Sequence, residues 1–100
     1  MTREEVLAAL AMHRDQIDAL DLRILALLNE RTLVVERIGE IKQHAGMPIY
    51  EPKREDEVYR NITENNHGPL PAEAVKRVFE RIIDEMRTVQ RLRMLEKEGK

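Results

Sequence analysis

The sequence predicts an all-α protein, on the basis of its composition and of where its turn-forming residues lie. Charged residues make up 36% of the chain and apolar residues 42%, whereas Phe, Trp and Tyr together make up only 3%. Strands favour aromatic and β-branched residues, so this balance indicates helices rather than a sandwich or barrel. Turn-forming residues gather around 46–48 and 65–71, which leaves three helical segments. A chain of 100 residues is expected to form one domain, residues 1–100, with one modest core.

The first segment is expected to be one very long helix, from about residue 3 to about residue 45. Thr2 and Glu5 have the spacing of a capping box, in which each side chain satisfies a free backbone N–H of the first turn. Gly46 suits a left-handed cap at the far end, and Pro48 follows it. Between these signals, apolar residues recur at heptad spacing in two rows: 10, 17, 24 and 38, and 6, 20, 27, 34 and 41.

The length of this helix has an architectural consequence. At ~1.5 Å per residue the helix is roughly 65 Å long, whereas a compact domain of this size has a radius of gyration of ~13 Å. Two shorter helices cannot cover an apolar stripe of that length. Gly39 is the only weak point inside the helix, at a cost of ~1 kcal/mol relative to alanine. We therefore expect an unbroken helix and an intertwined helical homodimer.

Two shorter helices are expected after the first. The second runs from about residue 52 to about residue 66 and begins with Pro52, which is favoured in a first turn because its missing N–H would be unpaired there. The turn-like residues 65–69 end it. The third runs from about residue 71 to about residue 96 and carries an apolar stripe that includes Phe79, Ile83 and Met86.

Several cations occupy positions where the stripe of the long helix should be apolar. Arg31 falls in the row of 10, 17, 24 and 38, and Arg14 and Lys42 fall in a flanking row. Burial of an unpaired cation costs several kcal/mol, so these side chains need partners, water or a ligand. Arg31 and Lys42 point the same way, but Arg14 lies ~25 Å from Arg31 along the axis and cannot easily reach the same pocket. In an antiparallel or crossed dimer, Arg14 could reach the pocket of the partner chain. The alternative is that the long stems carry each charge past the apolar edge into water.

Two polar residues of the later helices also point inward. Glu55 shares the apolar side of the second helix, and Gln90 shares the apolar side of the third. A structural role is the alternative for Gln90, since a buried amide must be hydrogen-bonded in any case. If these groups converge, the pocket combines cations, one carboxylate and one amide donor, which suits a small polyanion that carries a hydroxyl group.

Other classes of protein and site are disfavoured. The chain contains no Cys and no Ser, and its three His residues have no ligand spacing, so we expect neither covalent catalysis nor a metal site. A net charge of −2 does not suggest nucleic-acid binding. The longest apolar run, residues 6–12, is too short to span a membrane, and no secretory signal is visible. We expect a cytoplasmic protein.

Four motifs, taken in order, resemble the all-helical chorismate mutase family: RDQIDALD at 14–21, LLNER at 27–31, IGEIK at 38–42 and PKRE at 52–55. The resemblance covers about residues 6–92. It implies an intertwined homodimer with shared active sites that rearranges chorismate to prephenate, without cofactor or metal, on the route to phenylalanine and tyrosine. Residues 62–69 are most similar to mutases fused to or associated with 3-deoxy-7-phosphoheptulonate synthase, which makes this enzyme an expected partner.

The resemblance also implies residue roles. Arg14 of the partner chain and Arg31 resemble the arginines that clamp the substrate carboxylates, for which the guanidinium fork is suited. Lys42 and Gln90 resemble the pair that donates hydrogen bonds to the breaking ether oxygen. Glu55 resembles the carboxylate that accepts a hydrogen bond from the ring hydroxyl.

Three further positions belong to the same implied wall. Arg54 resembles another arginine that faces a substrate carboxylate, and Glu51 resembles the acidic residue beside it, although an acid near a helix N-terminus is favourable in any case. Met86 stands where some members have a small hydroxyl residue that touches a carboxylate, and Met cannot donate this hydrogen bond.

Two alternative functions stay open at the level of the sequence. One is an isochorismate pyruvate lyase, which would bind a similar enol-pyruvyl ether on the same scaffold. The other is a non-catalytic regulatory or dimerisation module of a shikimate-pathway synthase.

Overall fold

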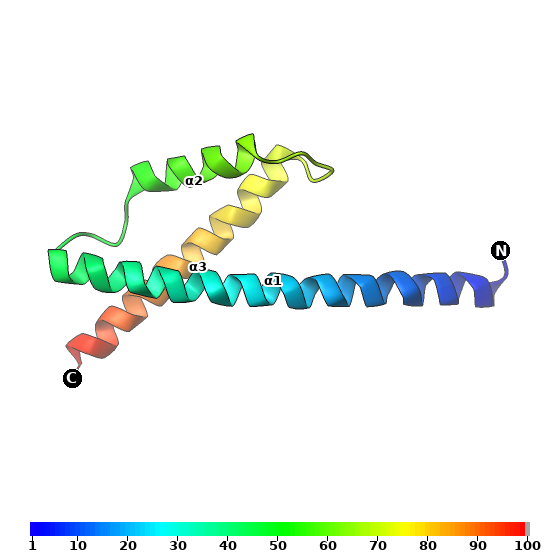
Figure 1. Cartoon of the computed structure of the whole chain (residues 1–100), viewed down its shortest axis with the longest axis horizontal. Coiled ribbons are helices and arrows are strands. Elements are labelled where there is room, and N and C mark those ends of the chain that lie inside the picture. The colour runs from blue at the N-terminus through cyan, green and yellow to red at the C-terminus, as the bar shows by residue number, and fades with distance from the viewer. Residues whose placement is uncertain (100) are drawn as a thin grey trace. The chain divides into compact units, whose positions relative to one another are not determined.

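The computed structural model describes residues 1–99 and consists of three helices: α1 (Arg3–Ala45), α2 (Pro52–Glu64) and α3 (Ala72–Glu98) (Figure 1). No strand occurs among these residues. The predicted all-α class, with one very long helix, is confirmed. Lys100, the last residue of the predicted domain, lies outside the described residues.

The ends of α1 are fixed by the local signals that the sequence predicts. The Glu5 N–H donates to Thr2 Oγ1 at 3.1 Å, and the Thr2 N–H donates to Glu5 Oε2 at 3.2 Å, which completes the capping box. Gly46 has a φ of +66°, the left-handed conformation that favours glycine at a helix C-terminus. The helix is therefore specified at both ends by residues within a few positions of each end.

The bounds of α2 and α3 differ slightly from the prediction. Pro52 opens α2 as expected, but the helix ends at Glu64 rather than at about residue 66. The reason is Asn65, whose backbone N–H and side-chain Nδ2 both donate to the carbonyl oxygen of Asn61 and so cap the last turn. Helix α3 starts at Ala72 and continues to Glu98, rather than from about 71 to about 96.

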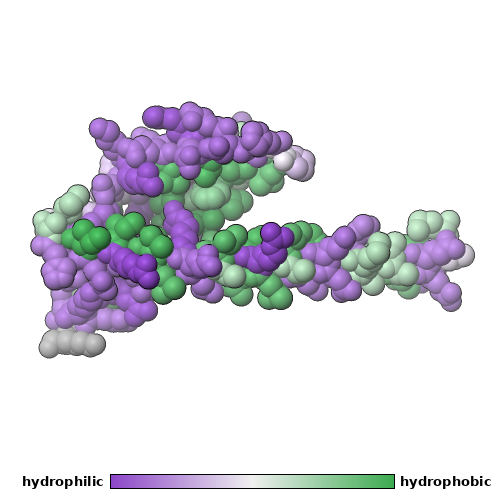
Figure 2. Space-filling model, in the orientation of Figure 1, coloured by the Kyte–Doolittle hydropathy of each residue, from purple (hydrophilic) through white to green (hydrophobic). Residues whose placement is uncertain are grey.

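The chain divides into two compact units, and the first, Met1–Leu33, consists of the two N-terminal residues and the part of α1 up to Leu33. Apolar side chains of both predicted heptad rows are exposed in this unit, and Figure 2 shows apolar residues at its surface. The large exposed ones in these rows are Val6, Leu10, Ile17, Leu20, Ile24 and Leu27. Within this unit, then, the stripe that should form a core lies in contact with solvent.

The second unit begins at Val34 and contains the end of α1 together with α2 and α3. Helices α2 and α3 pack against each other. The buried apolar side chains of the described residues all belong to α3: Val75, Ile83 and Met86. The core of this unit is therefore thin, and Gln90, a polar residue, is buried beside it. No helix within residues 1–99 has the length and hydropathy needed to cross a membrane.

Candidate active site

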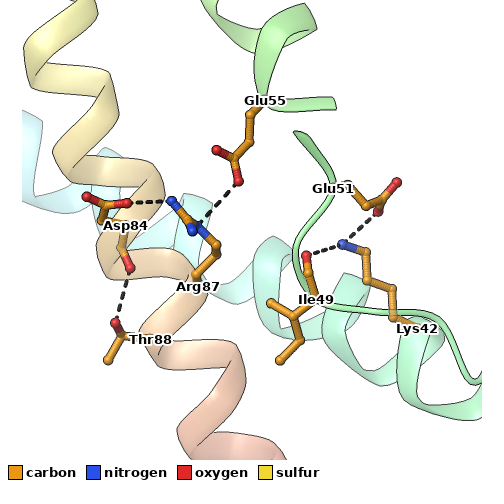
Figure 3. A network of polar contacts seen from close by, with 7 residues as sticks. All are labelled: Lys42, Ile49, Glu51, Glu55, Asp84, Arg87 and Thr88. Atoms are coloured by element: carbon orange, nitrogen blue, oxygen red, sulfur yellow. Dashed lines mark hydrogen bonds and ion pairs between the residues drawn. The ribbon is translucent and has the colours of Figure 1, made fainter. Parts of the chain in front are cut away.

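Lys42 lies in the last turn of α1 and is held by the segment that follows the helix (Figure 3). Its Nζ forms an ion pair with Glu51 Oε1 at 2.7 Å and donates to the carbonyl oxygen of Ile49 at 3.0 Å. The left-handed turn at Gly46 reverses the chain, which brings residues 49–51 back to the Lys42 side chain. Lys42 is only 12% exposed, yet an ammonium has three N–H donors, so one remains beyond these two contacts.

Glu55 lies in the first turn of α2 and forms an ion pair with Arg87 of α3. The distance from Arg87 Nε to Glu55 Oε2 is 3.3 Å, and the two side chains are 26% and 18% exposed. The guanidinium also pairs with Asp84 on its own helix and lies 5.2 Å from the centre of the Tyr50 ring (Figure 3 shows the polar contacts). Glu55 is predicted to point inward, and in the structure its carboxylate meets the guanidinium of Arg87.

Arg87 is the residue of this cluster that the sequence reasoning missed. It follows Ile83 by four positions, which places it on the edge of the buried stripe of α3. The reasoning that identified Arg31, a cation on an apolar stripe, would also have identified Arg87. Asp84, three residues before Arg87, is an ion-pair partner that the sequence alone suggests. A contact between Arg87 and Glu55 is therefore not needed to explain Arg87 at the level of the sequence.

Gln90 is 7% exposed and is fixed by a hydrogen bond across the second unit. Its Nε2 donates to the carbonyl oxygen of Val35 at 3.1 Å. Gly39, one turn further along α1, lies against Gln90, and a Cβ built there would lie 3.4 Å from Gln90 Cγ, which is ordinary van der Waals contact. Lys42 and Gln90, the two predicted donors, therefore contact different groups of the chain: Lys42 contacts Glu51 and Ile49, and Gln90 contacts Val35.

A small pocket of about 40 Å³ adjoins Gln90 and is large enough for water. Ion pairs between α1 and α3 lie along it: Arg93 with Glu36 at 3.4 Å, and Lys97 with Glu40 at 3.6 Å. These exposed pairs add little stability individually, because solvent and salt screen them. Among residues 1–99, no three His, Cys, Asp or Glu side chains gather closely enough to hold a metal ion.

The other predicted site residues lie in different surroundings. Arg54 is exposed and pairs with Glu57 on the same helix at 3.2 Å. Met86 is buried in the thin core of the second unit. Arg14 and Arg31 belong to the first unit, where Arg14 is exposed and Arg31 is half-buried.

Tyr59 follows Glu55 by one turn of α2 and is half-buried. Burial raises the pKa of the Tyr59 hydroxyl above its ordinary value, and the carboxylates of Glu55, Glu80 and Asp84 raise this pKa further, while Arg87 opposes them. Lys76 Nζ lies 5.7 Å from the centre of the Tyr59 ring. Tyr59 therefore has charged side chains of both signs around it rather than purely apolar neighbours.

Comparisons with known proteins match this arrangement of helices and residues to one family. A family model described as chorismate mutase type II matches residues 13–91. A chorismate mutase of Methanocaldococcus jannaschii is 31% identical over 93 residues, which cover 91% of this chain and 93% of that protein. The crystal structure of chorismate mutase from Helicobacter pylori in complex with prephenate superposes with a TM-score of 0.83 at 30% identity, and covers 89% of this chain and 97% of that one.

The chain also resembles part of larger enzymes. A bifunctional chorismate mutase/prephenate dehydratase of Neisseria gonorrhoeae is 44% identical over 79 residues, but these represent only 21% of that protein. The chain thus spans about a fifth of the length of this relative, whereas it covers almost all of the protein from Methanocaldococcus jannaschii. The family match extends over most of the chain, includes the segments that carry Lys42, Glu51, Glu55 and Gln90, and agrees with the three-helix fold. On this basis the chain belongs to the chorismate mutase type II family.

Proposed function

We propose that this chain is a chorismate mutase, which converts chorismate to prephenate by an intramolecular Claisen rearrangement. The observation that carries the proposal is the family match over residues 13–91. The prephenate complex of the similar Helicobacter pylori enzyme supports the choice of substrate. In this reaction a C–O bond breaks as a C–C bond forms within one molecule, so the protein needs no nucleophile and no proton transfer. This agrees with a site built from fixed donors and charges.

Lys42 and Gln90 are proposed as the donors to the ether oxygen, on which negative charge grows in the transition state. Both have the fixed position that such a role requires, since Lys42 is held by Glu51 and Ile49, and Gln90 by Val35. Donors that are already oriented stabilise the developing charge with little reorganisation, and the loss of one such donor commonly lowers kcat by about 10²–10³.

The other site residues are proposed in the roles that the family resemblance implies. Arg31, Arg54 and Arg14 of a partner chain would bind the two carboxylates of the substrate, where bidentate pairing favours Arg over Lys. Glu55 would accept a hydrogen bond from the ring hydroxyl. Glu51 would line the substrate pocket and hold Lys42 through their ion pair. Met86 would contribute apolar surface beside the substrate.

A homodimer is proposed as the active form, with each site using residues of both chains. The support is the exposed apolar rows of the first unit, which follow the heptad spacing typical of helices that pack against a second helix. The thin core of the second unit supports the same conclusion. A second copy of the chain would bury these rows and bring Arg14 to the partner's pocket.

Three narrower statements remain predictions. The chain is proposed to act as a single mutase domain in the cytoplasm. The proposed association with a 3-deoxy-7-phosphoheptulonate synthase is supported only by residues 62–69, whereas the relative from Neisseria gonorrhoeae carries prephenate dehydratase instead. Co-elution of the purified chain with each candidate enzyme on size exclusion tests the association, and co-elution with the dehydratase alone would contradict it.

The experiment that tests the proposed function is incubation of EDTA-treated protein with chorismate, followed by identification of the products by chromatography. Prephenate as the only product supports the proposal. Pyruvate released from isochorismate, without turnover of chorismate, would assign a lyase instead. A folded protein that acts on neither substrate would be a non-catalytic module.

Two matched variants connect the activity to the site. Lys42→Met removes the half-buried ammonium, and we expect kcat to fall by roughly 10²-fold or more because a donor to the transition state is lost. Lys53→Met removes an exposed ammonium from the first turn of α2 and should leave kcat unchanged. Equal activity in the two variants would exclude Lys42 from the site.

A further inference from the structure

We propose that Arg87 is a positioning residue that holds the Glu55 carboxylate in place to accept the hydroxyl group of the substrate. The inference rests on the proposed function, and it adds a residue that neither the sequence motifs nor the family resemblance identifies. All of the contacts that support it lie within the second unit.

The Arg87 guanidinium is itself fixed from three directions. Glu55 contacts it from α2, Asp84 from the preceding turn of α3, and the Tyr50 ring from the connection between α1 and α2. A planar guanidinium can meet a carboxylate at its edge and an aromatic ring at its face at the same time, which an ammonium cannot do. Arg87 therefore joins three segments around one carboxylate.

Glu55 needs such a partner, because its side chain is long and only 18% exposed. A long, partly buried carboxylate side chain without a cation beside it tends to turn towards water. The positive charge of Arg87, 3.3 Å from Oε2, holds the Glu55 side chain in place instead. The carboxylate then stays directed towards α3.

The ion pair leaves Glu55 able to bind something else. Within the described residues, Arg87 Nε is buried and makes no hydrogen bond, even though it lies at ion-pair distance from Glu55. The restraint is therefore electrostatic and does not use up an acceptor site in a well-aligned hydrogen bond. A carboxylate offers about four lone-pair sites on its two oxygens, so Glu55 keeps the capacity to accept an O–H donor.

The test measures chorismate turnover by Arg87→Met, Arg87→Lys and a control, Arg81→Met. Arg81 lies on the same helix and pairs with Glu85 at the exposed surface, so its loss removes an equal charge without touching Glu55. We expect Arg87→Met to raise KM by roughly 5- to 20-fold with kcat changed by less than about threefold, because a hydroxyl contact is made in ground and transition states alike. Arg87→Lys should recover part of the loss, and Arg81→Met should match the wild type.

A double-mutant cycle with Glu55→Gln separates positioning from other roles. If Arg87 acts through Glu55, Arg87→Met should change KM by less than about twofold in the Glu55→Gln background. An equal rise of KM in both backgrounds would overturn the inference, since Arg87 would then act on the substrate or on the fold directly. Thermal unfolding of each variant, followed by circular dichroism, identifies any loss that comes from the fold alone.

The failure of this inference can be distinguished from the failure of the proposed function. A wild-type protein that converts chorismate, with Arg87 variants of unchanged KM, would overturn only the role of Arg87. A folded wild-type protein that leaves chorismate unchanged would overturn the proposed function, and the role of Arg87 together with it.

Discussion

The amide of Gln90 supplies a hydrogen-bond donor that does not titrate. In the structure its Nε2 donates to the carbonyl oxygen of Val35, and a carbonyl can only accept. A glutamate in this place could donate only in its protonated form. The ether oxygen of the substrate, which is the proposed second partner of Gln90, is also an acceptor. Both the Val35 carbonyl and the ether oxygen therefore require a hydrogen-bond donor at position 90.

We therefore predict that Gln90→Glu shifts activity towards acid pH. Below the pKa of the new carboxyl group the side chain can donate, and above it the charge repels both the Val35 carbonyl and the oxygen of the transition state. Burial would raise that pKa above the ordinary value of about 4.3, so kcat/KM of the variant should fall as the pH rises through this raised pKa. The measurement is kcat/KM against pH for the variant and the wild type.

Thr88→Glu provides the control for this prediction. Thr88 is exposed on the same helix, so the substitution adds the same carboxyl group without placing it in the site. Its pH profile should resemble that of the wild type. An unchanged profile for Gln90→Glu would argue against a contact between Gln90 and the reacting oxygen.

The raised pKa of Tyr59 predicts that the folded protein loses stability at alkaline pH. Burial, together with Glu55, Glu80 and Asp84, raises its pKa above the value of 10.0 expected in the unfolded chain. The folded state then binds the phenolic proton more tightly, so this stabilising contribution is complete below the unfolded pKa and is lost as pH rises through the folded pKa. The free energy of unfolding should therefore fall above about pH 10.

The variant Tyr59→Phe should lose less stability over the same range, because phenylalanine has no proton to release. Urea unfolding at about pH 9 and about pH 11 measures the difference between the two proteins. The gap between the two midpoints should be smaller for the variant than for the wild type. Equal gaps would mean that the Tyr59 hydroxyl does not contribute to alkaline unfolding.

At the scale of the elements, Gly39 of α1 lies beside the Gln90 side chain of α3, whose amide donates to the carbonyl oxygen of Val35. A Cβ at position 39 would lie 3.4 Å from Gln90 Cγ and 3.7 Å from its Nε2, close to ordinary contact. Gly39→Ala should therefore keep activity and raise the melting temperature, since alanine favours a helix by ~1 kcal/mol over glycine.

Gly39→Leu is predicted to have the opposite result. A branched side chain at this position overlaps the Gln90 side chain and moves its amide away from the Val35 carbonyl, at a cost of about 1–3 kcal/mol. We expect a lower melting temperature and a kcat lower by roughly tenfold or more, because the donor is displaced. Comparison with Gly39→Ala tests the mechanism, and an active Gly39→Leu protein would contradict it.

The helices themselves are largely predictable from the sequence, because their ends depend on nearby residues. Thr2 with Glu5, Gly46 and Pro52 each act within a few positions along the chain, and each has the predicted role. The early end of α2 was not predicted, since Asn65 can continue a helix or cap it, and the outcome depends on its contact with Asn61.

The candidate site is less predictable for a related reason. Helical periodicity indicates that Lys42, Glu55 and Gln90 point inward, but it does not identify the group that each one meets. The contact between Glu55 and Arg87 joins positions 32 residues apart on different helices, and that pairing depends on how α2 packs against α3. Spacing along one helix carries no information about it.

For the whole molecule, the proposed shared site predicts complementation between two inactive variants. Arg14→Ala and Arg31→Ala homodimers should each lose most of their activity, because every site would lack one carboxylate-binding arginine. After the two proteins are mixed, unfolded and refolded together, the heterodimer should contain one site with both arginines. Activity should then rise to a substantial fraction of the wild-type value.

The measurement requires heterodimers of verified composition, which two different affinity tags on the two variants provide. Each variant refolded alone is the control and should stay inactive. Heterodimers that recover no activity would contradict a site shared between chains.

The small number of buried apolar side chains has a thermodynamic consequence if the chain functions as the proposed homodimer. Among the described residues the buried apolar side chains are Val75, Ile83 and Met86. In the proposed homodimer, most of the apolar surface of the chain would therefore be buried only through association. When folding and association are one process, stability follows the law of mass action and the melting temperature rises with protein concentration. Dilution would then convert the proposed dimers into unfolded chains, and the proposed mutase activity of a cell would depend more than linearly on the amount of this protein.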